Sequence, residues 1–454
     1  MDCCWRPIRV ACARSPIWRG MRCGLYTATL KIMRTSLCYV FSLSLLASCA
    51  TAPRGSSVDG LNPGLAGDIL ALQKDLIDRE VTGSNMILVA GKDGELYRHV
   101  QNSGKRGDRD ITAETLFPIW SMSKPITIVA MMTLFEQGKF SFDDPVSKYI
   151  PCFANLQVVD GDDVRPAMKP LLVEHLMSHR SGYGYYVMGG GSTEAPAPPA
   201  YDRPHPNQTR FNDLQEFCEV TAKQPLMFEP GADFLYGINQ AILGRLVEVL
   251  SGMSFADYLQ EQIFGPLEMS STSFVLDDDR RARLQPLWIN LEIAPVVEGM
   301  PPPGGTIKGF TTLLNELTYS PRSEAHFGGE GLISCPADYA RFCQMLVAGG
   351  VYKGHRVLSQ DSIDRMTAPK SRDIFAPVNG GGMDMGYSVF VMRDAAGEGT
   401  QTPAGVFGWS GYHNTHFWID PKNELFALFV SRAREFNFDI PRRLRAAVYG
   451  AVER

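Results

Sequence analysis

Two hairpin patterns lie near opposite ends of the chain, and they restrict the possible folds more than any other feature. The first has MILV (86–89) and LYRHV (96–100) around an Asp-Gly pair, which suits a tight turn with positive φ. The second has HFWI (416–419) and LFALFV (425–430) around DPKNE. Helical patterns fill the region between them. The order strand, helices, strand therefore predicts an α/β (α+β) chain whose antiparallel sheet is built from both ends, flanked by helices, with a mostly helical domain inserted.

Three apolar periodicities predict amphipathic helices. Their members are Leu65, Ile69, Leu72 and Leu76, then Ile126, Val129, Ala130 and Leu134, then Ile238, Ile242, Leu246 and Val249, the last closing at Gly252. We expect a linker over 49–64 and one folded region over 65–454. Its α/β part should comprise about 65–135 and 325–454, and its helical part about 136–324.

The N-terminal segment, residues 1–48, has the pattern of a leader. Arg34 precedes an apolar run of 11 residues, Leu37 to Ala47, which is too short to span a membrane but suits a secretory signal. The run ends in Leu-Ala-Ser-Cys49, which resembles a bacterial lipobox. This predicts a start at Met33, with residues 1–32 untranslated, and a lipoprotein anchored through Cys49. Such a protein faces the periplasm, at the outer membrane; the alternative is an ordinary signal cut nearby.

Charge and cysteine content exclude several function classes. Residues 1–48 hold seven of the 44 basic and one of the 49 acidic residues, so the rest of the chain carries a formal charge of about −11. That sign argues against a nucleic-acid partner. Only Cys152, Cys218, Cys335 and Cys343 follow position 49, and no C-x-x-C occurs. A disulfide scaffold, a zinc ribbon and a redox pair are therefore not expected.

The stretch PIWSMSKP (118–125) contains the first candidate for chemistry. Ser121 and Lys124 are three residues apart, so on a helix they share a face and the amine can reach the hydroxyl, while Ser123 points elsewhere. A serine hydroxyl needs a base to become a nucleophile, and a lysine can be that base only when neutral. With a reference pKa of ~10.4, neutrality at pH 7 costs a lysine roughly 4–5 kcal/mol. An S-x-x-K alone is also compatible with a helix start followed by a solvated lysine.

The sequence blocks around this motif resemble a known family, although the motif alone is too short to show this. Five blocks, in order from about residue 63 to the end, are TLFPIWSMSKPIT, FEQGKFSFDDPVSKYIP, LLVEHLMSHRSGYG, FEPGADFLYGINQAILGRLVEVLSGMSFADYL and GGEGLISCPADYARFCQMLVAGG. Together they resemble the serine hydrolases related to class C β-lactamases and D-alanyl-D-alanine peptidases, which have the penicillin-binding-protein fold.

The resemblance implies a role for each matching position. Ser121 matches the nucleophile and Lys124 the lysine that activates it. Tyr236, in FLYGIN, matches the tyrosine of the second motif, which acts as general base or acid. Trp409-Ser410-Gly411 stands where the third motif, K-T-G in lactamases, is expected. The backbone N–H groups of Ser121 and Tyr412 are expected to form the oxyanion hole.

Two departures from the family pattern bear on the substrate. Ile238 replaces the asparagine of Y-x-N, and Trp409 replaces the lysine of K-T-G, so neither an amide nor a cation is available at these substrate-binding positions. Losing a charged hydrogen bond costs about 1.5–3 kcal/mol, which disfavours carboxylate-bearing substrates by roughly tenfold or more. The W-x-G form resembles the carboxylesterase branch (family VIII). Aromatic residues on a candidate rim, namely Tyr183, Tyr185 and Tyr186, suit an uncharged group but are equally compatible with loop packing.

Other constellations are weaker. His175, His179, His413 and His416 could serve a Ser-His-Asp triad, but no G-x-S-x-G occurs, and His175 with His179 lacks the glutamate and third ligand of a zinc site. We expect His179 to brace a turn, and His413 and His416 to be structural or to face the substrate.

The sequence thus predicts a serine hydrolase that cleaves small-molecule esters or amides through an acyl-enzyme on Ser121, with no cofactor and no metal. Two alternatives stay open: a β-lactamase or D-alanyl-D-alanine peptidase, and a non-catalytic binding protein of the same fold. The natural substrate and the oligomeric state are not predicted.

Overall fold

A computed structural model describes residues 62–185, 211–293, 305–312, 323–376 and 380–450, all of which belong to one unit, Pro53–Arg454. The predictions about Met33, Cys49 and Tyr186 fall outside these residues. Among the helices described, none is both long and apolar enough to cross a membrane.

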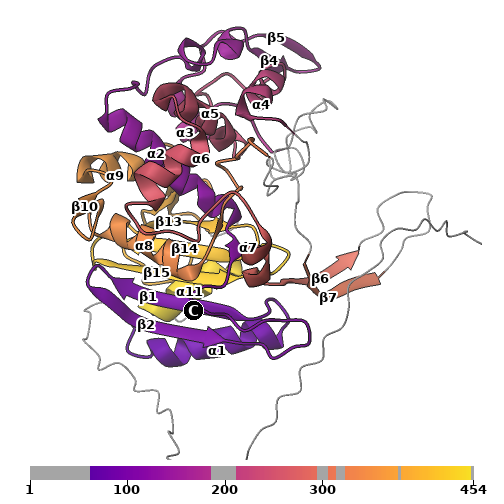
Figure 1. Cartoon of the computed structure of the whole chain (residues 1–454), viewed down its shortest axis with the longest axis vertical. Helices are drawn as coiled ribbons and strands as arrows, with labels where there is room; N and C mark the ends of the chain where they lie inside the picture. The colour runs from indigo at the N-terminus through magenta and orange to yellow at the C-terminus, as the bar shows by residue number, and fades with distance from the viewer. Residues whose placement is uncertain (1–61, 186–210, 294–304, 313–322, 377–379, 451–454) are drawn as a thin grey trace, which may run out of the picture. The chain divides into compact units, whose positions relative to one another are not determined.

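The predicted sheet from both chain ends is confirmed. It has seven antiparallel strands in the order β11-β12-β13-β14-β15-β1-β2 (Figure 1). Strand β1 pairs with β15 from Asn85↔Ser431 to Gly91↔Leu425, so the two predicted hairpins lie side by side. The strands are β1 (Asn85–Gly91), β2 (Gly94–Gln101), β11 (Met383–Met385), β12 (Phe390–Met392), β13 (Phe407–Gly411), β14 (Thr415–Asp420) and β15 (Leu425–Ser431).

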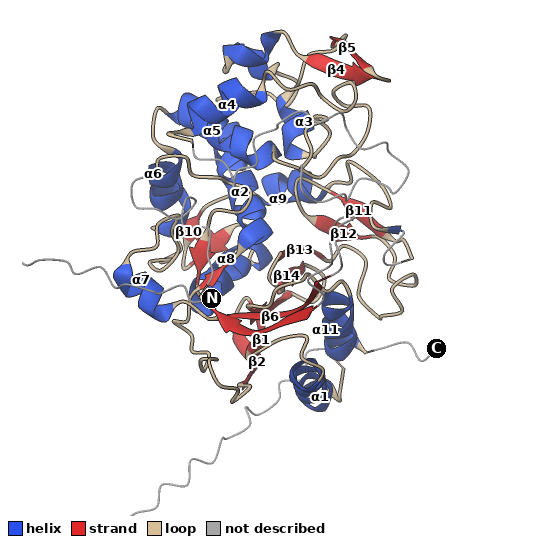
Figure 2. Ribbon diagram, turned by 90° about the vertical axis from the view of Figure 1, so that its right-hand side faces the viewer, coloured by secondary structure: helices blue, strands red, loops and turns tan. Residues whose placement is uncertain are grey.

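Helices cover both faces of this sheet. On β14, Phe417 contacts Tyr339 of α8 (Pro336–Val347), whereas the indole of Trp418 donates to the hydroxyl of Tyr449 on α11 (Asp439–Tyr449). Because successive strand residues point to opposite faces, α8 and α11 lie on opposite sides. Helix α1 (Leu65–Asp78) packs beside α11, as Figure 2 shows.

The central helix is α2 (Ser123–Glu136). Its residues from Ser123 to Leu134 are all buried, so the helix is enclosed around its whole circumference. It packs against α5 (Asn239–Ser251) and α9 (Gln360–Thr367), and the short turn η1 (Trp120–Met122) leads into it. The other helical segments are α3 (Val173–Met177), α4 (Leu214–Thr221), α6 (Phe255–Leu259), α7 (Asp278–Arg283), η2 (Val146–Lys148), η3 (Pro151–Ala154) and η4 (Gln260–Phe264).

Four two-stranded pairs complete the described elements. One of them positions the site, because β3 (Phe117–Pro118) pairs with β8 (Ile333–Ser334) and so places the start of α2 beside the GGEGLIS segment. The remaining pairs are β4 (Gln157–Asp160) with β5 (Asp163–Pro166), β6 (Leu287–Ile293) with β7 (Gly305–Thr311), and β9 (Val351–Tyr352) with β10 (His355–Arg356).

The local helix predictions agree with α1, α2 and α5. Helix α5 closes at Gly252, whose φ of 76° is left-handed, as a glycine stop allows. Of the residues in this periodicity, Val249 is 39% exposed, whereas Val247 is buried. The division at about 135 and 325 into an α/β and a helical part stays a prediction.

Candidate active site

Ser121 lies in η1, which leads directly into α2. The preceding residue, Trp120, has a φ of 46°, a conformation that costs a non-glycine residue about 1–3 kcal/mol. Its indole N–H donates to Nδ1 of His413 at 2.9 Å, and its ring meets the ring of Tyr412 edge-on at 5.8 Å. These contacts hold the backbone next to Ser121 in a conformation that the isolated peptide disfavours.

Lys124 is completely buried, and its ammonium group is surrounded by acceptors. Nζ donates to Ser121 Oγ at 3.0 Å, to the carbonyl oxygen of Gly329 at 2.6 Å and to the hydroxyl oxygen of Tyr185 at 3.1 Å. These three acceptors match the three N–H groups of a protonated lysine. The structure therefore brings Ser121 and Lys124 together as the spacing predicts, and the solvated-lysine alternative is wrong.

Tyr185 makes a second hydrogen bond, to Glu330. Its hydroxyl donates to Oε2 of Glu330 at 2.5 Å, and Glu330 is only 4% exposed. Burial first, then the nearby Glu330 and Tyr236, raise the pKa of Tyr185 well above its usual range, so this phenol is protonated.

Sequence reasoning considered Tyr185 only as a rim residue and did not single out Glu330. The one signal for Glu330 was an acidic residue inside the glycine-rich run GGEGL. Of the other rim candidates, Tyr183 is buried and packs on Phe153, so it belongs to the core.

Tyr236 lies beside this cluster. Its ring centroid is 4.8 Å from Lys124 Nζ, which places the amine against the ring, and its hydroxyl accepts a hydrogen bond from the indole N–H of Trp409 at 3.3 Å. Within the described residues, the Tyr236 hydroxyl is thus bonded to Trp409 and not directly to Lys124 or Ser121. Its role as a general acid or base stays a prediction.

The third motif forms the end of β13. The Trp409 ring lies at an oblique angle to the ring of Tyr236, 5.6 Å away, and the ring of Phe375 lies 6.0 Å from that of Trp409. A Cβ on Gly411 would stand 2.3 Å from the carbonyl oxygen of Ile119, so only glycine lets β13 approach the Ser121 segment this closely. The backbone of Tyr412 follows directly, which fits the predicted oxyanion hole without testing it.

Ser410 has an internal partner. Its hydroxyl lies 2.7 Å from Nδ1 of His416, the residue opposite it on β14. Burial, helped by Arg445, lowers the pKa of His416 to about 3, and burial lowers that of His413 well below its usual range. Both histidines are therefore neutral, and His413 braces Trp120 while His416 braces Ser410. The prediction that Ser410 contacts substrate stays untested.

His179 braces a turn, as predicted. It has a φ of 56°, and its Nδ1 accepts from the backbone N–H of Gly237 at 3.3 Å and lies 2.9 Å from Nδ2 of Asn239. Burial lowers its pKa well below the usual range, so the ring is neutral and can accept. His179 thereby fixes the segment that follows Tyr236.

The position after Gly237 belongs to the core. Ile238 is 6% exposed and precedes the first turn of α5. The nearest amide, that of Asn239, is turned inward, where its oxygen accepts from the hydroxyl of Ser181 at 2.5 Å. The structure thus offers no asparagine from this motif to a substrate. Contact between Ile238 and a substrate stays a prediction.

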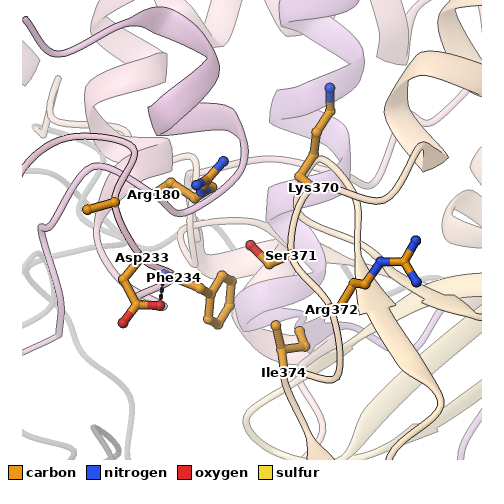
Figure 3. Close-up of a pocket in the computed structure, with 8 residues that line it drawn as sticks. Arg180, Asp233, Phe234, Lys370, Ser371, Arg372 and Ile374 are labelled. Carbon is orange, nitrogen blue, oxygen red and sulfur yellow. Dashed lines mark hydrogen bonds between the residues drawn. The ribbon is translucent and has the colours of Figure 1, made fainter.

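A hollow of about 350 Å³ lies between the segment 232–234 before Tyr236 and the segment 370–374 (Figure 3). Phe234, Ser371 and Ile374 contribute to its wall. Phe234 stands two residues before Tyr236, and Ile374 directly precedes Phe375. Lys370, also in the wall, is paired with Glu174 at 2.7 Å. Among the described residues, no group of three His, Cys, Asp or Glu side chains could hold a metal ion.

Comparisons with known proteins agree with this geometry. The sequence profile of the family described as Beta-lactamase matches residues 74–451. An uncharacterised protein of Mycobacterium tuberculosis (strain CDC 1551 / Oshkosh) is 30% identical over 350 residues, which are 71% of this chain and 80% of that protein. Esterase EstB of Burkholderia gladioli is 26% identical over 392 residues, 82% of this chain and 92% of EstB.

A solved structure shows the same fold. That of EstCE1, described as a hydrolase with promiscuous acyltransferase activity, has a TM-score of 0.70 and 22% identity, and the likeness covers 85% of this chain and 99% of that one. The predicted β-lactamase-like fold is thereby confirmed. The profile match over residues 74–451 shows that the chain belongs to the beta-lactamase family of serine hydrolases, and its similarity to EstB is consistent with the carboxylesterase branch.

Proposed function

We propose that the protein cleaves carboxylic esters of small uncharged molecules through an acyl-enzyme on Ser121. The observation that carries the proposal is the 3.0 Å hydrogen bond between Ser121 Oγ and the fully buried amine of Lys124. A serine hydroxyl held by an amine that is shielded from water is the arrangement that nucleophilic catalysis needs.

The reaction has two steps that balance. In the first, Ser121 Oγ bonds to the ester carbon, its proton passes to Lys124, and the alcohol leaves with a proton delivered through Lys124 or Tyr236. In the second, a water attacks the acyl-enzyme, gives up a proton by the same route, and Ser121 regains its own as the acid departs. The backbone N–H groups of Ser121 and Tyr412 stabilise the oxyanion in both steps.

The preference for uncharged esters rests on the aromatic group beside Lys124. The rings of Tyr185, Tyr236, Trp409 and Phe375 follow one another at centroid distances of 5.6, 5.6 and 6.0 Å. Trp409 takes the place of the lysine that binds a carboxylate in lactamases, and its indole N–H is directed to Tyr236. Such a wall binds acyl or alcohol groups by apolar contact. The similarity to esterase EstB supports this substrate class.

A comparison of two substrate classes tests the proposal. Purified protein should hydrolyse short-chain nitrophenyl esters with kcat/KM roughly tenfold or more above that for a chromogenic cephalosporin, whose carboxylate finds no lysine at position 409. The reverse ranking would make the protein a β-lactamase or peptidase. Binding of either compound without turnover would make it a binding protein of this fold.

We also propose a cellular location for the protein, on the basis of the sequence pattern that ends at Cys49. We expect diacylglyceryl modification of Cys49 to anchor the protein at the cell envelope, facing the periplasm at the outer membrane. In cells fed an alkyne-labelled fatty acid, the wild-type protein should be labelled and sediment with membranes. Cys49→Ala should lose both properties; a Cys49→Ala protein that is still labelled would refute the anchor.

A further inference from the structure

Lys124 reaches a buried carboxylate through one intervening hydroxyl. The path runs from Lys124 Nζ to the Tyr185 oxygen, 3.1 Å, and from the Tyr185 hydroxyl to Glu330 Oε2, 2.5 Å. Both distances are those of good hydrogen bonds. Since Tyr185 donates to Glu330, the lone pairs of its oxygen are left to accept from Lys124.

The proposed function requires Lys124 to be neutral before it can act as a base, and this path offers a way to remove its extra proton. An ammonium group whose three N–H bonds point at acceptors cannot take a proton from Ser121, so one of its protons must leave first. The three hydrogen-bond acceptors of Lys124 differ in whether they can take this proton away. Ser121 is the group to be activated, the Gly329 carbonyl cannot pass a proton on, and Tyr185 can, because its own proton already lies against Glu330.

We infer that Glu330 is the proton acceptor that readies Lys124 for catalysis, with Tyr185 as the relay between them. One proton moves from Lys124 Nζ to the Tyr185 oxygen while the Tyr185 hydroxyl proton moves to Glu330. The ammonium becomes an amine, the carboxylate becomes a carboxylic acid, and Tyr185 is a phenol before and after. Lys124 can then take the proton of Ser121 as its oxygen attacks the ester.

Burial favours this transfer. Lys124 is 0% and Glu330 4% exposed, so both charged forms lack the solvation that water would give them. The transfer replaces two buried charges by two neutral groups without changing the total charge. The raised pKa of Tyr185 agrees with a relay that never passes through a free phenolate.

The charged and titratable groups around the relay come from several elements. Lys124 faces it from α2, Tyr236 from the segment before α5, and Glu330 from the loop before β8. Burial first, and then the nearby charge of Lys124, lowers the pKa of His179. Of these four described groups, Glu330 is the carboxylate, and it is the one that is hydrogen-bonded to Tyr185.

The inference rests on the proposed function and is tested with Glu330→Gln and Tyr185→Phe on an uncharged nitrophenyl ester. Glutamine still accepts a hydrogen bond from Tyr185 but takes no proton, and phenylalanine removes the relay oxygen. Both variants should lower kcat about 10- to 100-fold near neutral pH with KM changed less than about threefold. The acidic limb of the kcat profile should move to higher pH, where solvent hydroxide can deprotonate Lys124. Glu330→Asp should keep the wild-type limb in part.

Two residues outside the site, the half-buried Glu248 and the buried Tyr258, provide matched controls. Glu248 is bonded to Arg245, and Tyr258 to the Thr133 hydroxyl, in the helical region. Glu248→Gln and Tyr258→Phe should leave the pH profile in place. If Glu330→Gln folds poorly by circular dichroism, the limb shift of Tyr185→Phe decides. If both relay variants keep the wild-type pH profile of kcat while Ser121→Ala is inactive, the relay is wrong and the proposed function stands. An active Ser121→Ala would instead overturn the proposed function.

Discussion

Ser121→Ala should lower kcat for ester cleavage at least ~10⁴-fold and leave thermal stability close to that of the wild type. The alanine removes the oxygen that forms the acyl bond, and no other hydroxyl can replace it in the same geometry. Ser121 is partly exposed and its Oγ receives one hydrogen bond, from Lys124, so the folded state loses little. The readouts are steady-state kinetics and intact-protein mass spectrometry with a slowly released acyl ester, which should add one acyl group to the wild type and none to the variant.

Ser123, two residues along, is the matched control. It is fully buried, and its Oγ accepts from the backbone N–H of Leu332 at 3.2 Å. Ser123→Ala should therefore cost about 1–3 kcal/mol of stability, because a buried N–H loses its partner, while kcat stays within a few-fold. If acylation persists in Ser121→Ala and disappears in Ser123→Ala, the nucleophile is Ser123 and the assignment to Ser121 is wrong.

The parts of this structure that could be predicted from sequence are those with a local physical signature. Apolar runs and a turn define each hairpin, and the burial of both faces of β15 makes its pairing with β1 favourable. The Ser121–Lys124 contact follows from one helical turn. Glycine at position 411 is explained by a backbone approach, yet the sequence alone shows only a glycine.

The contacts that escaped prediction join segments without periodicity. Tyr185 and Glu330 are 145 positions apart, and both lie outside helices and strands, where no periodic pattern predicts the path of the chain. The Trp120–His413 hydrogen bond spans 293 positions and depends on how β13 meets η1. His413 and His416 could be identified as flanking the motif, but their roles as neutral braces follow from complete burial, which only the fold supplies.

Lys124→Met should lower the rate of acylation by about 10³- to 10⁴-fold, because Ser121 loses the base that is hydrogen-bonded to it. Methionine has a similar length and suits a buried site, so the fold should persist. The variant does leave the Gly329 carbonyl without this donor. Stopped-flow measurement of nitrophenol release should show a rapid burst in the wild type and none in Lys124→Met, while circular dichroism and the melting temperature report on folding.

Tyr236→Phe separates the two candidate bases in the same experiment. If Lys124 is the base, Tyr236 serves chiefly in protonating the leaving alcohol, since its hydroxyl is bonded to Trp409 rather than to Ser121. Nitrophenolate leaves readily without a proton, whereas an alkoxide does not. Tyr236→Phe should therefore retain most of its activity on nitrophenyl esters and lose roughly 100-fold on ethyl esters. An equally severe loss of the nitrophenyl burst in Tyr236→Phe and Lys124→Met would contradict this assignment and make the tyrosine part of the base.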